Sequence, residues 1–127
     1  MIKRLTCNKT PKAVGAYCVA TKIGNLIFTS GQLPINAETG KIDNVDSIEW
    51  QVEQSMNNIK YILEENGSSL NSIVKTTVYL SDINDFAKFN EVYKSFFEES
   101  YPARTAFEVG KLPMNALVEI ECIAEVE

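Results

Sequence analysis

Alternating apolar and polar residues dominate both ends of this 127-residue chain, while helical spacing dominates two stretches between them. Alternation puts successive side chains on opposite faces of a strand, and apolar steps of three and four residues mark one face of a helix. These patterns predict two helices, over 47–66 and from the 81–84 cluster to about 97. They predict strands at 17–23, 26–30, 73–80, 104–109 and 117–126, with a short edge strand at 2–5.

The first helix has the clearest pattern. An apolar stripe recurs at three- and four-residue steps, at Ile48, Val52, Met56, Ile59 and Leu63. Asp46 is the expected N-cap, with Glu49 completing a capping box, and Gly67 suits the position just past the C-terminal end. These signals predict an amphipathic helix with one buried face.

The second helix carries an aromatic stripe, at Phe86, Phe89, Tyr93 and Phe96. Such a stripe is more typical of a protein core than of a ligand site. Pro102 prevents the helix from continuing. Earlier in the chain, Gly24-Asn25 indicates a tight turn between two strands, and residues 32–46 form a polar loop.

The order of these elements predicts one α+β domain over residues 1–127, with both helices on one face of a mixed sheet. If the apolar sets of the last two strands face the helices, Arg104 and Glu119 share the opposite face. That second face is half apolar, since Ile123 lies on it and is joined by either Phe28 or Ile27. A half-apolar open face favours burial against another copy of the chain, so a homo-oligomer is expected.

Composition excludes several kinds of function. The chain has no histidine, which removes histidine-dependent triads and most catalytic zinc sites. Its three scattered cysteines, Cys7, Cys18 and Cys122, form neither a disulfide framework nor a metal knuckle. A net charge of −5 disfavours nucleic-acid binding. The sequence shows neither a membrane-spanning apolar run nor a signal-peptide pattern, so a cytoplasmic protein is expected.

Two charged residues within the last strands are the leading candidates for chemistry. The guanidinium of Arg104 matches a carboxylate, although a salt bridge to Glu108 or Glu121 would also explain it. Glu119 could activate a water molecule if desolvation raised its pKa, or it could simply be a solvated strand residue.

Weaker candidates accompany them. Tyr17 follows a glycine-containing loop and either orients a ligand or packs against the protein. Ser30 and Gly31 end a strand, where they form a turn or present a hydroxyl and backbone N–H groups to an anion. Asn90 belongs to the polar surface of the second helix or to a ligand site.

Taken together, these residues resemble the reactive intermediate deaminase family, which is also called the RidA, YjgF or endoribonuclease L-PSP family and was once described as translation inhibitors. The matching stretches follow one another over nearly the whole chain, at 13–17, 27–34, 74–80, 84–90, 102–104 and 117–121. The last two form the signature region of the family.

The resemblance implies a chorismate-mutase-like fold, a homotrimer and ligand clefts between subunits. Spacing alone would pair 104–110 with 117–126 as a hairpin, whereas the resemblance places the final strand inside the sheet. It also implies hydrolysis of 2-aminoacrylate, its imine tautomer 2-iminopropanoate and 2-iminobutanoate to 2-oxo acids and ammonium, without a metal or cofactor.

By position, the resemblance assigns substrate-carboxylate binding to Arg104 and water activation to Glu119. Lining the cleft would be Tyr17, Ser30, Gly31, Asn90 and Ala106. Many relatives have cysteine at the position of Ala106, so thiol-based behaviour is not expected in this chain. The alternative function is a non-catalytic regulatory trimer that binds a small metabolite. RNA cleavage is disfavoured by the acidic charge and the absence of histidine.

Overall fold

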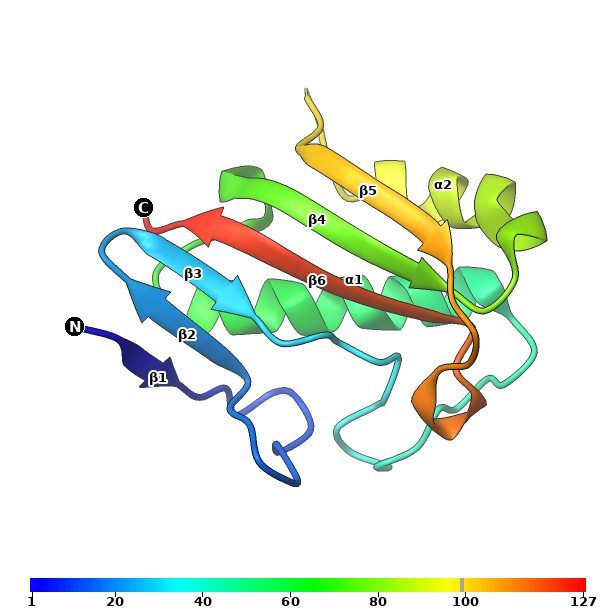
Figure 1. Ribbon diagram of the computed structural model, residues 1–127, viewed down its shortest axis with the longest axis horizontal. Helices are drawn as coiled ribbons and strands as arrows, with labels where there is room; N and C mark the ends of the chain where they lie inside the picture. Colours follow the sequence, from blue (N-terminus) through cyan, green and yellow to red (C-terminus); the bar gives the residue numbers. More distant parts are fainter. Residues whose placement is uncertain (99) are drawn as a thin grey trace.

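A computed structural model gives the structure of the chain and describes residues 1–98 and 100–127. A six-stranded sheet has the strand order β1-β2-β3-β6-β4-β5, and two helices cover one of its faces (Figure 1). The strands are β1 (Lys3–Leu5), β2 (Ala20–Ile23), β3 (Leu26–Thr29), β4 (Ile73–Leu80), β5 (Ala103–Glu108) and β6 (Val118–Glu125). The helices are α1 (Ile48–Glu65) and α2 (Phe86–Lys94), with 3₁₀ turns η1 (Leu70–Ser72), η2 (Ile83–Asp85) and η3 (Pro113–Asn115). This confirms the predicted α+β fold class.

The last strand, β6, lies inside the sheet. It pairs antiparallel with both β3 and β4, while β4 and β5 pair parallel and leave β5 at the edge. The hairpin suggested by spacing is therefore wrong, and the placement implied by the family resemblance is confirmed. Parallel neighbours need a long crossover, and α2 provides it between β4 and β5.

Helix α1 begins one residue later than the sequence suggested. Its N-cap is Ser47 rather than Asp46, and the Ser47 hydroxyl accepts a hydrogen bond from the Trp50 N–H at 3.1 Å. Both residue types cap well, so local sequence did not distinguish them. Gly67 follows the helix with φ 83°, and the Ser68 N–H donates to the Leu63 carbonyl at 2.8 Å. This is the expected glycine-dependent C-terminal cap.

The main core lies between the helices and the inner face of the sheet. Val52 and Ile59 of α1 and Val78 and Ile120 of the central strands are all completely buried. Deep in this layer, the hydroxyls of Thr76 and Tyr93 lie 2.7 Å apart, and the Cys122 N–H donates to the Thr29 hydroxyl at 3.0 Å. No helix among the described residues is long and apolar enough to cross a membrane.

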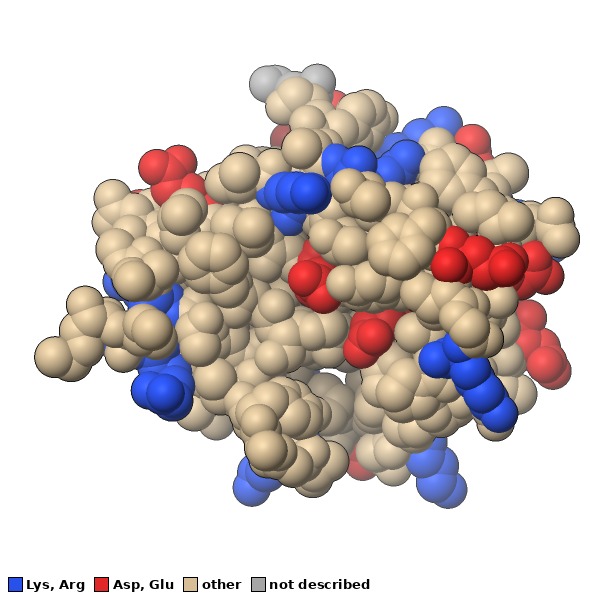
Figure 2. Space-filling view, in the orientation of Figure 1, with Lys and Arg blue, Asp and Glu red and all other residues tan. Residues whose placement is uncertain are grey.

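The outer face of the sheet is uncovered and partly apolar (Figure 2). Phe28 is 37% exposed and Phe107 is 43% exposed, whereas Ile27 is buried on the helix side, which decides between the two alternatives for β3. Phe107 packs edge-on against Tyr79, with ring centroids 5.4 Å apart. The apolar residues of this face, here called the open face, are Ile23, Leu26, Phe28, Tyr79, Phe107 and Ile123.

Candidate functional site

Arg104 projects from β5 toward helix α2. Its Nη1 donates a hydrogen bond to the Asn90 side-chain oxygen at 2.8 Å. The guanidinium carbon lies 5.0 Å from the ring centroid of Tyr93, and the rings of Phe86 and Phe89 are only slightly farther, at 5.3 and 5.5 Å. Flat cations stack well on aromatic faces. The aromatic stripe therefore serves as core and also as a platform that orients Arg104.

Neither of the two carboxylates considered as salt-bridge partners of Arg104 is paired with it among the described residues. The Glu108 carboxylate accepts from the Ile83 N–H at 2.9 Å, and the Glu121 carboxylate accepts from the Tyr79 hydroxyl at 2.7 Å. Asn90 is the only hydrogen-bond partner of the Arg104 side chain in the part of the chain that the structure describes. Most of the guanidinium fork is thus available to an external anion.

A pocket of about 360 Å³ opens beside this guanidinium. It is lined by Asn90, Tyr93, Lys94, Tyr101, Pro102 and Arg104. Lys94 adds a second cation, although it also pairs with Glu91 at 3.2 Å. This pocket suits an anionic group of small size.

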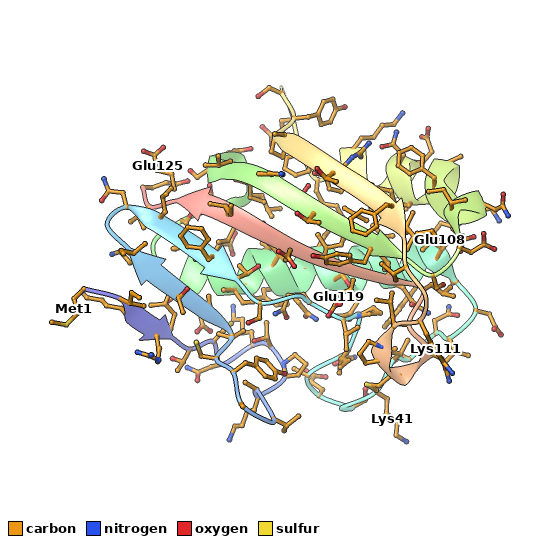
Figure 3. The ribbon with its side chains drawn as sticks, in the orientation of Figure 1. Met1, Lys41, Glu108, Lys111, Glu119 and Glu125 are labelled. Carbon is orange, nitrogen blue, oxygen red and sulfur yellow. The ribbon has the colours of Figure 1, made fainter. Side chains whose placement is uncertain are left out.

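Glu119 lies on the open face, near the start of β6 and opposite Tyr79 of β4 (Figure 3). Burial raises its pKa above the ordinary value of 4.5, and the negative charge of Glu121 raises it further. The Tyr79 hydroxyl bonds to Glu121, and the described residues show no comparable bond to Glu119. A desolvated carboxylate with raised pKa and no competing partner is suited to take a proton from water.

Gly31 allows Glu119 to lie where it does. A Cβ atom at position 31 would come within 2.7 Å of Glu119 Oε2 and 2.8 Å of its carboxyl carbon. The backbone of the neighbouring Gln32 bonds to Ile120 in both directions, at 2.8 and 3.2 Å, which keeps this segment against β6. Gly31 and Tyr17 also line one pocket of about 380 Å³.

Ser30 holds the segment that carries Tyr17. Its hydroxyl donates to the Cys18 carbonyl at 2.7 Å, and its N–H donates to the Val19 carbonyl at 2.9 Å. The Ser30 hydroxyl thus has a structural partner, and its direct contribution is to fix the loop before β2. The strand predicted at 17–23 is observed only as β2 from Ala20 to Ile23, so its predicted start is wrong, and Tyr17 lies in the preceding loop, 55% exposed.

Within one chain, Arg104 and Glu119 do not share a face, so the predicted shared face is wrong. Arg104 pairs with Thr76 and Glu119 pairs with Tyr79, and residues three apart on one strand point to opposite sides. This register puts their Cα atoms about 14 Å apart. The error arose from orienting Phe107 and its neighbours toward the helices, whereas on the edge strand β5 they cover the open face.

Ala106 lies on the same side of β5 as Arg104 and packs, half-buried, against the core. The Val109 N–H bonds to the Leu80 carbonyl of β4 at 2.9 Å, so by strand alternation the Ala106 N–H points to the free edge. The Ala106 N–H, two residues from Arg104, therefore remains available at the edge of the sheet, although this chain has no thiol at position 106. The structure groups Arg104, Asn90 and Ala106 in one half-site, and Glu119, Gly31, Ser30 and Tyr17 in another.

The family model described as Endoribonuclease L-PSP matches residues 7–126. A RutC family protein of Pyrococcus abyssi is 56% identical over 116 residues, covering 91% of each chain. A 2-iminobutanoate/2-iminopropanoate deaminase of Escherichia coli is 42% identical over 127 residues, covering 98% of each. The crystal structure of E. coli TdcF with bound serine matches with a TM-score of 0.93 and 38% identity, covering 98% of this chain and 99% of that one.

The chain belongs to the YjgF family. This confirms the resemblance drawn from the sequence. Family members include deaminases of small imino acids, and the half-sites around Arg104 and Glu119 are where the resemblance placed ligand binding and water activation.

Some contributors to the two half-sites of this YjgF-family chain were missed from sequence. Lys94 and Tyr101 line the pocket beside Arg104, and the Tyr79–Glu121 bond lies next to Glu119. Only the position of Lys94, one helical turn after Asn90, offered a signal, because residues four apart share a helix face. Among the described residues, no group of three His, Cys, Asp or Glu side chains could hold a metal ion.

For Glu119 in the water-activating role that the family resemblance implies, Gly31→Ala is expected to lower activity rather than the stability of the fold. Gly31 has no left-handed backbone angle, so alanine meets no backbone strain and acts only by pushing the carboxylate away. A displacement of about 1 Å at a catalytic group costs roughly 10²-fold in rate. The measurement is kcat/KM beside the thermal midpoint, with Gly110→Ala as control because no atom lies within 4 Å of its added Cβ. Equal losses in both variants would contradict the role of Gly31.

Proposed function

We propose that this protein is a deaminase that hydrolyses reactive 2-enamine and 2-imino acids to 2-oxo acids and ammonium. Its substrates would be 2-aminoacrylate, as the tautomer 2-iminopropanoate, and 2-iminobutanoate. The observation that carries the proposal is the Arg104 guanidinium, stacked on aromatic rings, bonded to Asn90 and open to a small pocket. A fixed fork of this kind is suited to a carboxylate next to the reacting carbon. The deaminase name of a 42% identical relative supports the same substrate class.

The chemistry requires little beyond orientation and a base. The substrate reacts as the protonated imine: Glu119 would take a proton from water as the oxygen attacks the iminium carbon, giving a neutral carbinolamine. Glu119 would then return that proton to the nitrogen, and ammonia would leave as the carbonyl forms and the hydroxyl proton is released. The iminium carbon is already electrophilic, so a held carboxylate and a polarised water suffice.

We place the complete site between two copies of the chain, in a homotrimer. One chain holds Arg104 and Glu119 on opposite faces, so a substrate bound by both needs Arg104 of one copy and Glu119 of the next. The free edge of β5 and the apolar open face are the surfaces that such an assembly would cover. This arrangement agrees with the clefts that the family resemblance implies.

The deciding experiment generates 2-aminoacrylate with a serine dehydratase and follows pyruvate release. The protein is expected to accelerate the release beyond the spontaneous rate in proportion to its concentration. An unchanged rate, together with binding of pyruvate or serine, would favour the regulatory alternative instead. An unchanged rate without binding would remove both functions.

Phe28→Glu is expected to convert the assembly to monomers. The variant puts a charge on the open face, where burial against a neighbour would desolvate it without a partner. Sedimentation velocity at micromolar concentration is the measurement. Val45→Glu is the matched control, because Val45 is 62% exposed in a loop away from the sheet and its variant should remain trimeric. A Phe28→Glu trimer as stable as the parent protein would contradict assembly through this face.

A further inference from the structure

The pocket lined by Tyr17 and Gly31 is much larger than a water molecule or a methyl group. Its volume is about 380 Å³, and it lies between the loop before β2, the loop after β3 and the turn η3. Figure 2 shows the surface hollowed between these loops. Most of its lining is apolar, including Val14, Val19, Leu33, Ile35 and Met114.

Glu119 lies beside the wall of this pocket that Gly31 forms. Its carboxylate approaches Gly31, which is itself part of the pocket wall, and in Figure 3 the Glu119 side chain lies on the side of β6 that faces these loops. A substrate whose reacting carbon lies next to Glu119 can therefore direct its side chain past Gly31 into the apolar space. Lys12 is the only charged residue among those that line the pocket.

Met114 is held over this pocket by its backbone. Met114 and Asn115 have φ values of 59° and 55°, both in the left-handed region that residues other than glycine seldom adopt. The adjacent Leu112 and Ala116 are buried in a small second core and fix both ends of the turn. Met114 remains 51% exposed, so the strained turn presents a long apolar side chain without burying it.

We propose that this pocket binds the side chain of the imino acid, and that Met114 selects apolar side chains longer than ethyl. The inference rests on the proposed function, because the substrate side chain reaches this pocket when the reacting carbon lies next to Glu119. Apolar walls favour each added methylene group, and a second carboxylate on the substrate would lose hydration there, with Lys12 as the one cation among the lining residues. The thioether of methionine adapts to chains of different shape.

Binding of stable 2-oxo acids tests the inference independently of catalysis. The probes are pyruvate, 2-oxobutanoate, 2-oxopentanoate and 2-oxohexanoate, with 2-oxoglutarate as the charged comparison. Each added methylene should tighten binding about threefold to fourfold, and 2-oxoglutarate should bind less tightly than 2-oxopentanoate. With ¹³C-methyl methionine, the Met114 signal should move, while buried Met56 and the terminal Met1 report any general change.

The variant Met114→Gln keeps the length of the side chain and removes its apolar character. It should reduce the ratio of 2-oxohexanoate to pyruvate affinity at least about fivefold, and Ile83→Ala, an exposed apolar change on η2, should preserve that ratio. The inference would be overturned if affinity did not rise along the series, if 2-oxoglutarate bound more tightly than 2-oxopentanoate, or if the Met114 signal did not move. If the series holds but imine hydrolysis is not accelerated, the proposed function fails and the pocket assignment stands.

Discussion

Arg104→Ala is expected to lower kcat/KM for 2-iminopropanoate hydrolysis about 10²- to 10³-fold, because charge-assisted bonds to the substrate carboxylate are lost. The side chain is prepared for that role by Asn90 and by the three aromatic rings beneath it. Arg104→Lys is the informative companion: it keeps the charge but lacks the planar fork and its stacking, so it should recover only part of the activity. Circular dichroism and sedimentation confirm that each variant keeps its fold and assembly.

Mixing two inactive variants gives the sharper result. Arg104→Ala and Glu119→Gln, co-expressed at equal levels with different tags, should regain about one quarter of the parental activity if each cleft takes one residue from each of two copies. In such a mixture, one cleft in four combines an intact Arg104 with an intact Glu119 from the adjacent copy. Glu119→Gln alone should lose about 10²- to 10⁴-fold, as expected for a general base.

The control separates complementation from simple mixing. Each variant expressed alone must remain inactive. When the double variant Arg104→Ala/Glu119→Gln is co-expressed with the parent chain, only clefts formed by two parent copies should be active. A mixture of the two single variants that stays inactive, although sedimentation shows mixed trimers, would contradict a cleft shared between copies.

Helical periodicity and strand alternation were enough to predict the elements. The stripe from Ile48 to Leu63 predicted α1, and the β-branched run from Ile73 to Leu80 predicted β4 with the observed bounds. These are local signals, set by how side chains repeat along one element. The one-residue error at Ser47 occurred where two adjacent residues could both serve as N-cap.

Alternation could not predict which side of the sheet each set faces. It divides β5 into two sets but does not say which set meets the helices, and on an edge strand both faces accept apolar residues. Arg104 turned inward because the rings of α2 and Asn90 offered it partners, a contact that joins residues 14 apart in sequence. The approach of Gly31 to Glu119 depends on the bridge between Gln32 and Ile120, and no local pattern encodes such a pairing.

The pH dependence of activity is expected to depend on Glu119 and on its neighbour Glu121. Glu119 must be ionised to act as a base, and burial together with the Glu121 charge raises its pKa, so the acid limb of kcat/KM should have its midpoint above pH 4.5. Tyr79, directly opposite Glu119 on β4, has a pKa of about 12 and stays neutral throughout the assay range. Gly31, the third neighbour, carries no titratable side chain.

Glu121→Gln removes the only charged group that shifts Glu119 among the described residues. The acid limb should therefore move to lower pH, and the plateau should fall because a carboxylate with lower pKa is a weaker base. Glu125→Gln is the matched control, since Glu125 is exposed farther along β6 on the same side and should leave the profile unchanged. Identical profiles for the parent protein and Glu121→Gln would show that Glu121 has no part in tuning Glu119.

Stability gives an independent measurement of the same pKa. A carboxyl group whose pKa is higher in the folded state binds protons more tightly there, so its contribution to stability declines as pH rises from 4.5 through the raised value. Glu119→Gln removes this decline, and the variant should therefore gain stability relative to the parent at pH 7 but not at pH 4. Urea unfolding at both values checks it; a loss of stability at pH 7 would mean that Glu119 supports the fold. A gain would show that the fold keeps a carboxylate at a cost in stability, as expected where that group serves a reaction.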